Sequence, residues 1–238
     1  MTMSDKTIIR PILISAFLIM CAARALGQVQ DGSSKDYILL ISSYSHDSRD
    51  VTELNNDFDL AALDLEINME TKIESLGVLS LCNIREWRST MNEILARQST
   101  ESLRGIVLIG QEAWGTFLSL DSIPDVPFSG CKITEAGIFI PDSVKQAAGW
   151  EPPSISTRDM AIEKRASGAI MYDFDIVGTM QLAMRLYPDI KNVALLSDNS
   201  YGGLSLLSKF REVMKSNFFQ MKTIERAYGI DDMDAYSL

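Results

Sequence analysis

Short apolar runs alternate with helix-spaced apolar positions along most of the chain. The runs predict buried strands, because each is only a few residues long and almost free of charge. They lie at 37–41, 72–79, 105–109, 126–133 and 168–172. Between them, apolar residues recur at i, i+3 and i+4, the spacing of amphipathic helices; Asp50 and Asn83, each with a glutamate three residues later, predict two helix starts. This alternation predicts an α/β fold: a Rossmann-like parallel sheet in a 2-1-3-4 order with helices on both faces.

The second half of the chain repeats the pattern on a smaller scale. Asp173 and Asp175 are placed to cap a helix over 176–186, and the apolar run 192–196 predicts a parallel strand covered on both faces. A polar, glycine-rich loop is expected over 197–203, at the carboxyl end of that strand, where open α/β sheets bind ligands. A helix over 204–217 and a last strand over 222–228 complete the predicted elements.

Breaks in this pattern predict the domain organisation. Glycine and prolines make 141–164 a loop-rich connection with room for one short helix, and 137–140 is a possible extra strand. No helix is expected after 222–228, so the second lobe is predicted to be incomplete. The predicted parts are a signal peptide, a linker, an N-terminal α/β lobe and a partial second lobe, at 1–27, 28–36, 37–172 and 173–238.

The first residues resemble a secretory leader. Lys6 and Arg10 precede an apolar run from Pro11 to Ala23, too short for a comfortable membrane span, and small residues follow it. Cleavage is expected after Ala25 or Gly27, with an uncleaved anchor as the alternative. The chain is therefore expected to be exported, to the periplasm or another extracytoplasmic compartment.

The net charge of the chain excludes one class of binding partner. Without residues 1–27 the formal charge is 19 − 31 = −12, against −10 for the whole chain, and no basic stripe is visible, so nucleic acid is not expected as a partner.

Cys82 and Cys131 are expected on strands three spacings apart, about 14 Å at about 4.8 Å each. A disulfide needs Cα atoms within about 7 Å, so two separate buried thiols are predicted.

Few chemical motifs are present. Ser129 with Lys132 matches Ser-x-x-Lys, and 197–199 matches Ser-Asp-Asn, both elements of serine β-lactamases and penicillin-binding proteins. The serine is expected on a strand rather than at a helix start, however, and Lys-Thr-Gly is missing. His46 is the only histidine, and no zinc or nucleotide motif occurs. Neither a metal nor a cofactor is predicted.

Three stretches resemble the type 1 periplasmic-binding fold, in particular the ABC-transporter substrate-binding-like domains that also serve as extracytoplasmic sensors of two-component histidine kinases. The stretches are YILLISSYSHDS, LRGIVLIGQEAWGTFLSLDSIPDVPFSGCKI and GTMQLAMRLYPDIKNVALLSDNSYGG. The resemblance implies two lobes that hold a small solute in a cleft and close on it. It also implies which side chains face that cleft: Ser43, Tyr44, Gln111, Glu112, Lys132, Asp173, Asp198, Asn199 and Tyr201.

Each of these residues also has a structural interpretation: Asp173 and Asn199 could cap helices, and Tyr44 could be a half-buried aromatic. The resemblance implies a ligand-binding module and no enzyme, since the kinase modules of such sensors are not found in these 238 residues. The favoured function is the sensing part of a histidine kinase, with a membrane signalling or transport partner. The alternatives are a stand-alone solute-binding protein, a non-functional fragment and a serine hydrolase.

Overall fold

The structure is a computed structural model that describes residues 36–45, 49–64, 69–78, 84–141, 151–198, 200–218 and 220–228. The expectations for the leader, most of the linker, His46, Cys82, Asn83 and Asn199 lie outside these residues. None of the helices within the described ranges has the length and apolar character needed to cross a membrane.

Five parallel strands form the main sheet, in the order β2-β1-β3-β4-β7. Their bounds are β1 Tyr37–Ser42, β2 Glu70–Ser75, β3 Leu103–Ile109, β4 Phe128–Thr134 and β7 Gly168–Tyr172. The predicted 2-1-3-4 order is confirmed, and β7 adds a fifth strand beside β4. Parallel pairing needs crossover connections, which the helices between these strands supply.

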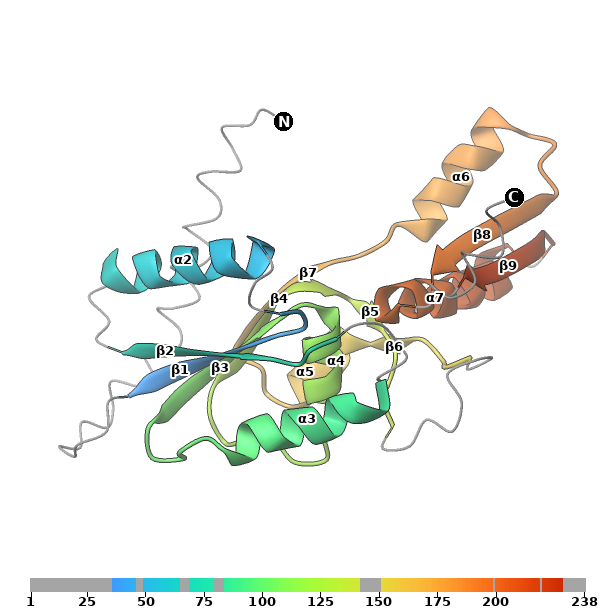
Figure 1. The fold of residues 1–238 in the computed structure, drawn as a ribbon. Coiled ribbons are helices and arrows are strands. Elements are labelled where there is room, and N and C mark those ends of the chain that lie inside the picture. Colours follow the sequence, from blue (N-terminus) through green and yellow to red (C-terminus); the bar gives the residue numbers. More distant parts are fainter. Residues whose placement is uncertain are drawn as a thin grey trace, which may run out of the picture.

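Helices cover both faces of this sheet (Figure 1). Helix α2 (Arg49–Asp64) lies on one face, where Phe58 and Ala61 pack on Ile38 and Leu40. The other face carries α3 (Ile84–Ala96), α4 (Gln111–Leu118) and α5 (Thr157–Glu163), which enclose the larger core around Trp87, Trp114 and Phe117. Alternate residues of β1 and β3 enter the two cores, as strand geometry requires. The predicted α/β class is confirmed.

The chain between β4 and β7 contains two short strands, β5 (Ala136–Gly137) and β6 (Ile155–Ser156), paired antiparallel. The expected strand over 137–140 is therefore shorter than predicted and begins one residue earlier. Thr157 at the start of α5 is buried, and its hydroxyl lies 2.7 Å from the carbonyl oxygen of Thr134. This contact fixes the connection to the end of β4.

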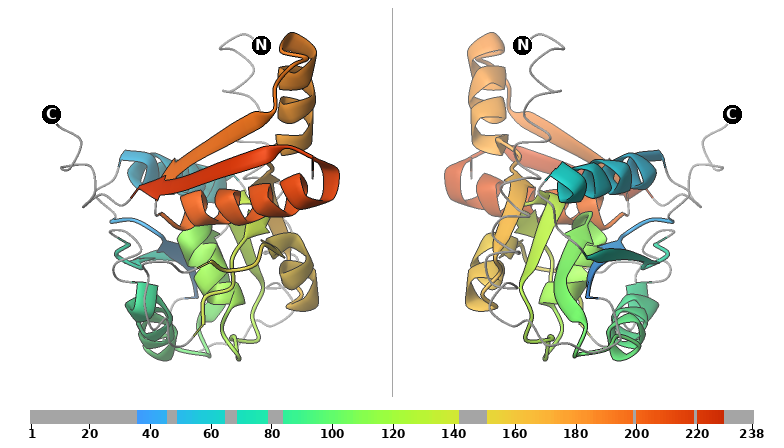
Figure 2. Two further views of the ribbon diagram at one scale, coloured as in Figure 1. Left: turned by 90° about the vertical axis from the view of Figure 1, so that its right-hand side faces the viewer. Right: turned by 90° about the vertical axis from the view of Figure 1, so that its left-hand side faces the viewer.

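A second, two-stranded parallel sheet follows: β8 (Asn192–Asp198) pairs with β9 (Lys222–Tyr228). Helix α6 (Ile176–Leu186) precedes it with the predicted bounds, and Asp175 accepts the cap hydrogen bond from the amide of Gly178 at 2.7 Å. Figure 2 shows β8 and β9 lying along helix α7 (Tyr201–Asn217). The expected long loop over 197–203 is wrong, because β8 continues to Asp198 and α7 already begins at Tyr201.

The expectation that this strand is covered on both faces is also wrong. Exposure alternates along β8, and Leu196 is 66% exposed while Leu195 packs into the core. Helices α6 and α7 both pack against Val193 and Leu195, so only one face of this two-stranded sheet is covered. Apolar composition therefore did not distinguish a half-covered strand from a fully covered one.

Candidate functional site

Parallel strands end together at one edge of a sheet, and polar side chains gather at that edge here. They follow β1 and β3 or are the last residues of β4, β7 and β8. We call this set the carboxyl-edge cluster: Tyr44, Gln111, Glu112, Thr134, Tyr172 and Asp198. Four of these six residues were predicted to face a ligand; Thr134 and Tyr172 were not.

Tyr44 and Glu112 form the first pair of the cluster. The Tyr44 hydroxyl donates to Oε1 of Glu112 at 3.1 Å, although the two residues are 68 positions apart. Glu112 is only 5% exposed and lies in the first turn of α4, where the helix dipole stabilises a carboxylate. Partial burial, followed by the negative charge of Glu112, raises the pKa of Tyr44. The phenol therefore stays protonated at neutral pH and remains a hydrogen-bond donor.

Gln111 connects the ends of β4 and β7. Its Nε2 donates to the Tyr172 hydroxyl at 2.9 Å. Its Oε1 lies 3.1 Å from the Thr134 hydroxyl, which also lies 2.7 Å from the carbonyl oxygen of Ala136, so one proton can serve either acceptor. Tyr172 is 47% exposed and Tyr44 is 50% exposed. Two aromatic rings are thus held by their hydroxyls while half of their surface stays open to solvent.

Asp198 brings the second sheet into the cluster. Its Oδ1 accepts from the backbone amide of Ser200 at 3.1 Å and from the Ser200 hydroxyl at 2.6 Å. The carboxylate is exposed, and its charge is among those that raise the pKa of Tyr44. Helix α7 also reaches the cluster, because a Cβ placed on Gly202 would lie 3.2 Å from Oε1 of Gln111.

Ser43 supports the cluster from below. It is fully buried, and its Oγ accepts the backbone amide of Ala113 at 3.0 Å, which satisfies one of the unpaired amides at the start of α4. Gly110 precedes the helix with φ of 97°, and a Cβ there would meet the Ser43 side chain. The contact orients the first turn of α4, which carries Gln111 and Glu112. Ser43 was predicted to face the cleft, and the structure places it beneath the surface.

Tyr201 is also buried rather than open. Its hydroxyl donates to the Ile138 carbonyl oxygen at 3.0 Å and accepts from the Ile138 amide at 3.3 Å. Its ring centroid lies 6.3 Å from that of Trp87, and a Cβ on Gly115 would collide with its hydroxyl. Tyr201 therefore anchors α7 in the main core and, in this structure, is not accessible to a ligand.

Asp173 and Lys132 are the other predicted residues that the structure describes. Asp173 is exposed, and its Oδ1 accepts from the amide of Phe174 at 2.8 Å. It lines a pocket of about 480 Å³ between the start of α6 and the second half of α7. Lys132 is exposed with φ of 55°, within a register irregularity of β4.

The Ser-x-x-Lys element does not form an accessible site. Ser129 lies inside β4 and is fully buried, and among the described residues its Oγ has no hydrogen-bond partner. The enzymes with this element place the serine at a helix start. Cys131 is a free thiol, partly buried; burial raises its pKa to about 11, and the charge of Lys132 opposes that shift. Within the described residues no group of three or more acidic, cysteine or histidine side chains could hold a metal ion.

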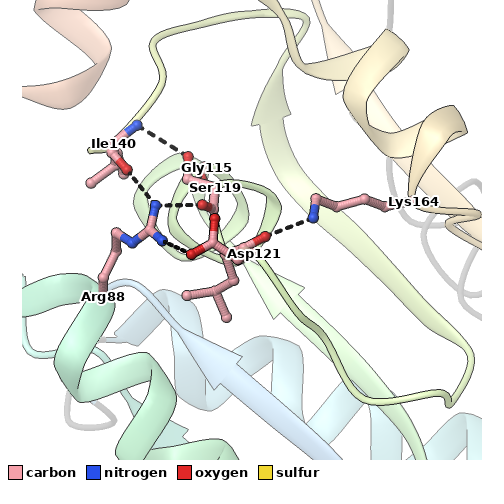
Figure 3. Close-up of polar contacts among 7 residues, drawn as sticks. Arg88, Gly115, Ser119, Asp121, Ile140 and Lys164 are labelled. Carbon is pink, nitrogen blue, oxygen red and sulfur yellow. Dashed lines mark hydrogen bonds and ion pairs between the residues drawn. The ribbon is translucent and has the colours of Figure 1, made fainter. Parts of the chain in front are cut away.

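The far end of α4 is fixed by two cations (Figure 3). Arg88 of α3 is 7% exposed; its Nη1 donates to the carbonyl oxygens of Ser119 at 2.5 Å and Ile140 at 3.1 Å. Its Nη2 lies 3.2 Å from the carboxylate of Asp121, and Lys164 Nζ donates to the Leu120 carbonyl oxygen at 2.7 Å. Cations at a helix C-terminus stabilise its unpaired carbonyl groups. Arg88 therefore positions the helix whose first turn carries two cluster residues.

No protein-family model matches the chain, and neither does any curated protein. Solved structures do resemble it. An extracellular ligand binding receptor from Desulfohalobium retbaense is 12% identical, with a TM-score of 0.49. The match covers 85% of this chain and 31% of the receptor chain. An arabinose-bound carbohydrate transporter solute binding protein from Agrobacterium radiobacter is 13% identical, with a TM-score of 0.40, over 83% and 58% of the two chains. A Caulobacter myo-inositol binding protein is 10% identical, with a TM-score of 0.40, over 85% and 58%.

The chain thus spans about a third to three fifths of the length of these proteins. They have the type 1 periplasmic-binding-protein-like fold that the sequence resembles. Because the TM-scores lie below 0.5, the fold class of this chain rests on its own sheet: five parallel strands in the order β2-β1-β3-β4-β7 with helices on both faces.

Proposed function

We propose that this chain is a ligand-binding module of an exported protein and that it holds a small solute at the carboxyl-edge cluster. The observation that carries the proposal is that half-exposed Tyr44 and Tyr172 meet at the first turn of α4, through hydrogen bonds with Glu112 and Gln111, and that the start of α7, next to Asp198, also reaches Gln111. A few polar groups placed around exposed aromatic surface are typical of small-molecule sites. We propose that the module acts by binding and not by catalysis.

Solute binding would be transmitted through the start of α7. Asp198 is hydrogen-bonded to Ser200, whose Oγ caps α7 by accepting from the Gly203 amide at 3.0 Å. Tyr201 is fixed in the main core, so the first turn of α7 would move with the larger sheet. A solute that contacts Asp198 and Tyr44 together would favour the arrangement in which the two sheets are closest.

The favoured setting is the sensing part of a two-component histidine kinase, with a stand-alone solute-binding protein of an ABC transporter as the alternative. Both need an exported chain, which the expected leader supports, and both use a small solute and a membrane partner. The two settings predict different phenotypes. Deleting the gene should abolish a transcriptional response to the solute in the first case and uptake of the labelled solute in the second.

A thermal-unfolding screen of the full chain tests the proposed function. The panel contains neutral solutes (D-arabinose, myo-inositol), a diacid (succinate) and two cations (choline, putrescine). A solute at 100 times its Kd adds about 2.7 kcal/mol, a shift of about 5–10 °C for a chain of this size. We expect at least one solute to give such a shift, and Tyr44→Ala to reduce it below about 2 °C.

The matched control is Tyr187→Ala, which removes a tyrosine that is 67% exposed and lies at the end of α6. It should leave the solute-induced shift intact. A panel in which no solute stabilises the native chain more than the Tyr44→Ala chain would count against the proposed function.

A further inference from the structure

The charges of the carboxyl-edge cluster indicate which solute it accepts. Glu112 is only 5% exposed. It accepts a hydrogen bond from the Tyr44 hydroxyl, which is a neutral group and does not balance the negative charge of the carboxylate. Among the residues whose side chains the structure describes, no Lys, Arg or His forms an ion pair with Glu112. A buried carboxylate without a cation is costly, and the first turn of α4 offsets only part of that cost.

The aromatic rings add a second, independent feature. Tyr44 and Tyr172 each leave about half of their surface open, and hydrogen bonds to Glu112 and Gln111 hold their hydroxyls. Phe174 supports Tyr172 edge-on, with ring centroids 5.9 Å apart at 84°. Ordered aromatic faces beside carboxylates attract organic cations, because the ring quadrupole and the carboxylate charge act in the same direction.

Other solute classes fit this arrangement less well. A phosphate or carboxylate solute would approach Glu112 and the exposed Asp198, and like charges would repel it. A neutral polyol could stack on the rings but would leave the Glu112 carboxylate without a counter-charge. A small cation satisfies both features at once.

We infer that the carboxyl-edge cluster takes a small organic cation, with an ammonium or guanidinium group lying between Tyr44 and Tyr172 and paired with Glu112 and Asp198; the inference rests on the proposed function. Glu112 supplies the buried charge, the rings supply the faces, and Asp198 supplies a second carboxylate from the other sheet. Gln111 holds the Tyr172 ring in place through its 2.9 Å hydrogen bond.

Titration calorimetry on the full chain tests this with pairs of compounds of similar size, one cationic and one neutral. Choline is compared with 3,3-dimethyl-1-butanol, and putrescine with 1,4-butanediol. At least one cation should bind about tenfold or more tightly than its neutral partner. Raising the salt from 50 mM to 500 mM should weaken the binding of that cation and leave the neutral compound unaffected.

Four variants locate the effect. Glu112→Gln and Asp198→Asn remove charge at nearly constant volume, and the first should lower cation affinity about tenfold or more. Tyr172→Leu should lower it about fivefold, whereas Tyr172→Phe, which keeps the ring, should lower it less than about twofold. Unfolding midpoints identify any variant that fails to fold. If the buried Glu112 does not tolerate replacement, the exposed Asp198 and Tyr172 still provide variants that fold.

The outcomes separate the inference from the function on which it rests. If choline and putrescine do not bind while a neutral or acidic solute binds in a Tyr44-dependent manner, the cation inference is wrong and the proposed function stands. If cations bind equally well to the native chain and to all the charge-removing variants, the cluster is not their site and the inference is also wrong. If no solute of any charge binds, both fail.

Discussion

Replacing Arg88 with methionine should lower the free energy of unfolding by about 2–4 kcal/mol. The guanidinium is buried and donates to the carbonyl oxygens of Ser119 and Ile140, which methionine would leave without that donor. A buried acceptor that loses its partner costs about 1–3 kcal/mol. Asp121 contributes little to the effect, because its side chain is 89% exposed and stays hydrated when the ion pair is lost.

Urea unfolding at 25 °C measures this change, and Arg97→Met is the control. Arg97 also forms one ion pair, with Glu74 at 3.2 Å, but its side chain is 59% exposed. Exposed pairs of this kind contribute about 0–1 kcal/mol. Equal losses for the two variants would show that Arg88 does not fix the end of α4 as described.

The second large effect is expected at Tyr201. Tyr201→Ala should lower the free energy of unfolding by about 3–5 kcal/mol, because it removes a fully buried ring and leaves a cavity between α4, β5 and Trp87. Tyr201→Phe keeps the ring and loses only the two hydrogen bonds to Ile138, at a cost of about 1–2 kcal/mol.

The same urea experiment separates these variants, and the exposed Tyr187→Ala again serves as control, with an expected change below about 0.5 kcal/mol. If Tyr201→Ala were as mild as this control, α7 would not be anchored in the main core. The role of Tyr201 as the fixed point between the two sheets would then be wrong.

The order of the main sheet could be predicted because alternating strands and helices leave few parallel arrangements. The residue at which each strand ends was harder to predict. The second strand was expected over 72–79, but β2 stops at Ser75. Leu76 and Val78 remain buried, and their backbone N–H groups donate hydrogen bonds to the carbonyl oxygens of Ser42 and Ser43. Apolar spacing reports burial, and burial continues past the last paired residue.

Four of the six residues in the carboxyl-edge cluster were predicted from the sequence. The resemblance to the periplasmic-binding fold implied them, and it places them at the ends of strands, where ligands of open sheets bind. Thr134 and Tyr172 were missed because only the register of β4 and β7 brings them to Gln111. Ser200 in front of α7 was a readable N-cap signal that would have placed Tyr201 on a helix face.

Arg88 shows what sequence reasoning cannot supply. Its acceptors lie 31 and 52 residues away, on a helix end and a loop whose positions depend on the whole fold. Within α3 an arginine beside Trp87 suggests only a polar helix face. The partners of such a buried charge are distant in the sequence, so the local spacing of apolar residues does not predict them.

Hydrogen–deuterium exchange of the full chain tests the central claim, that solutes bind at the carboxyl-edge cluster. It is run with and without the panel compound that gives the largest thermal shift. The account predicts slower exchange in peptides covering 42–45, 110–113 and 171–174, with no comparable change in 209–217 beside the Asp173 pocket. Protection confined to 175–177 and 209–217, with none at the ends of β1, β3 and β7, would contradict it.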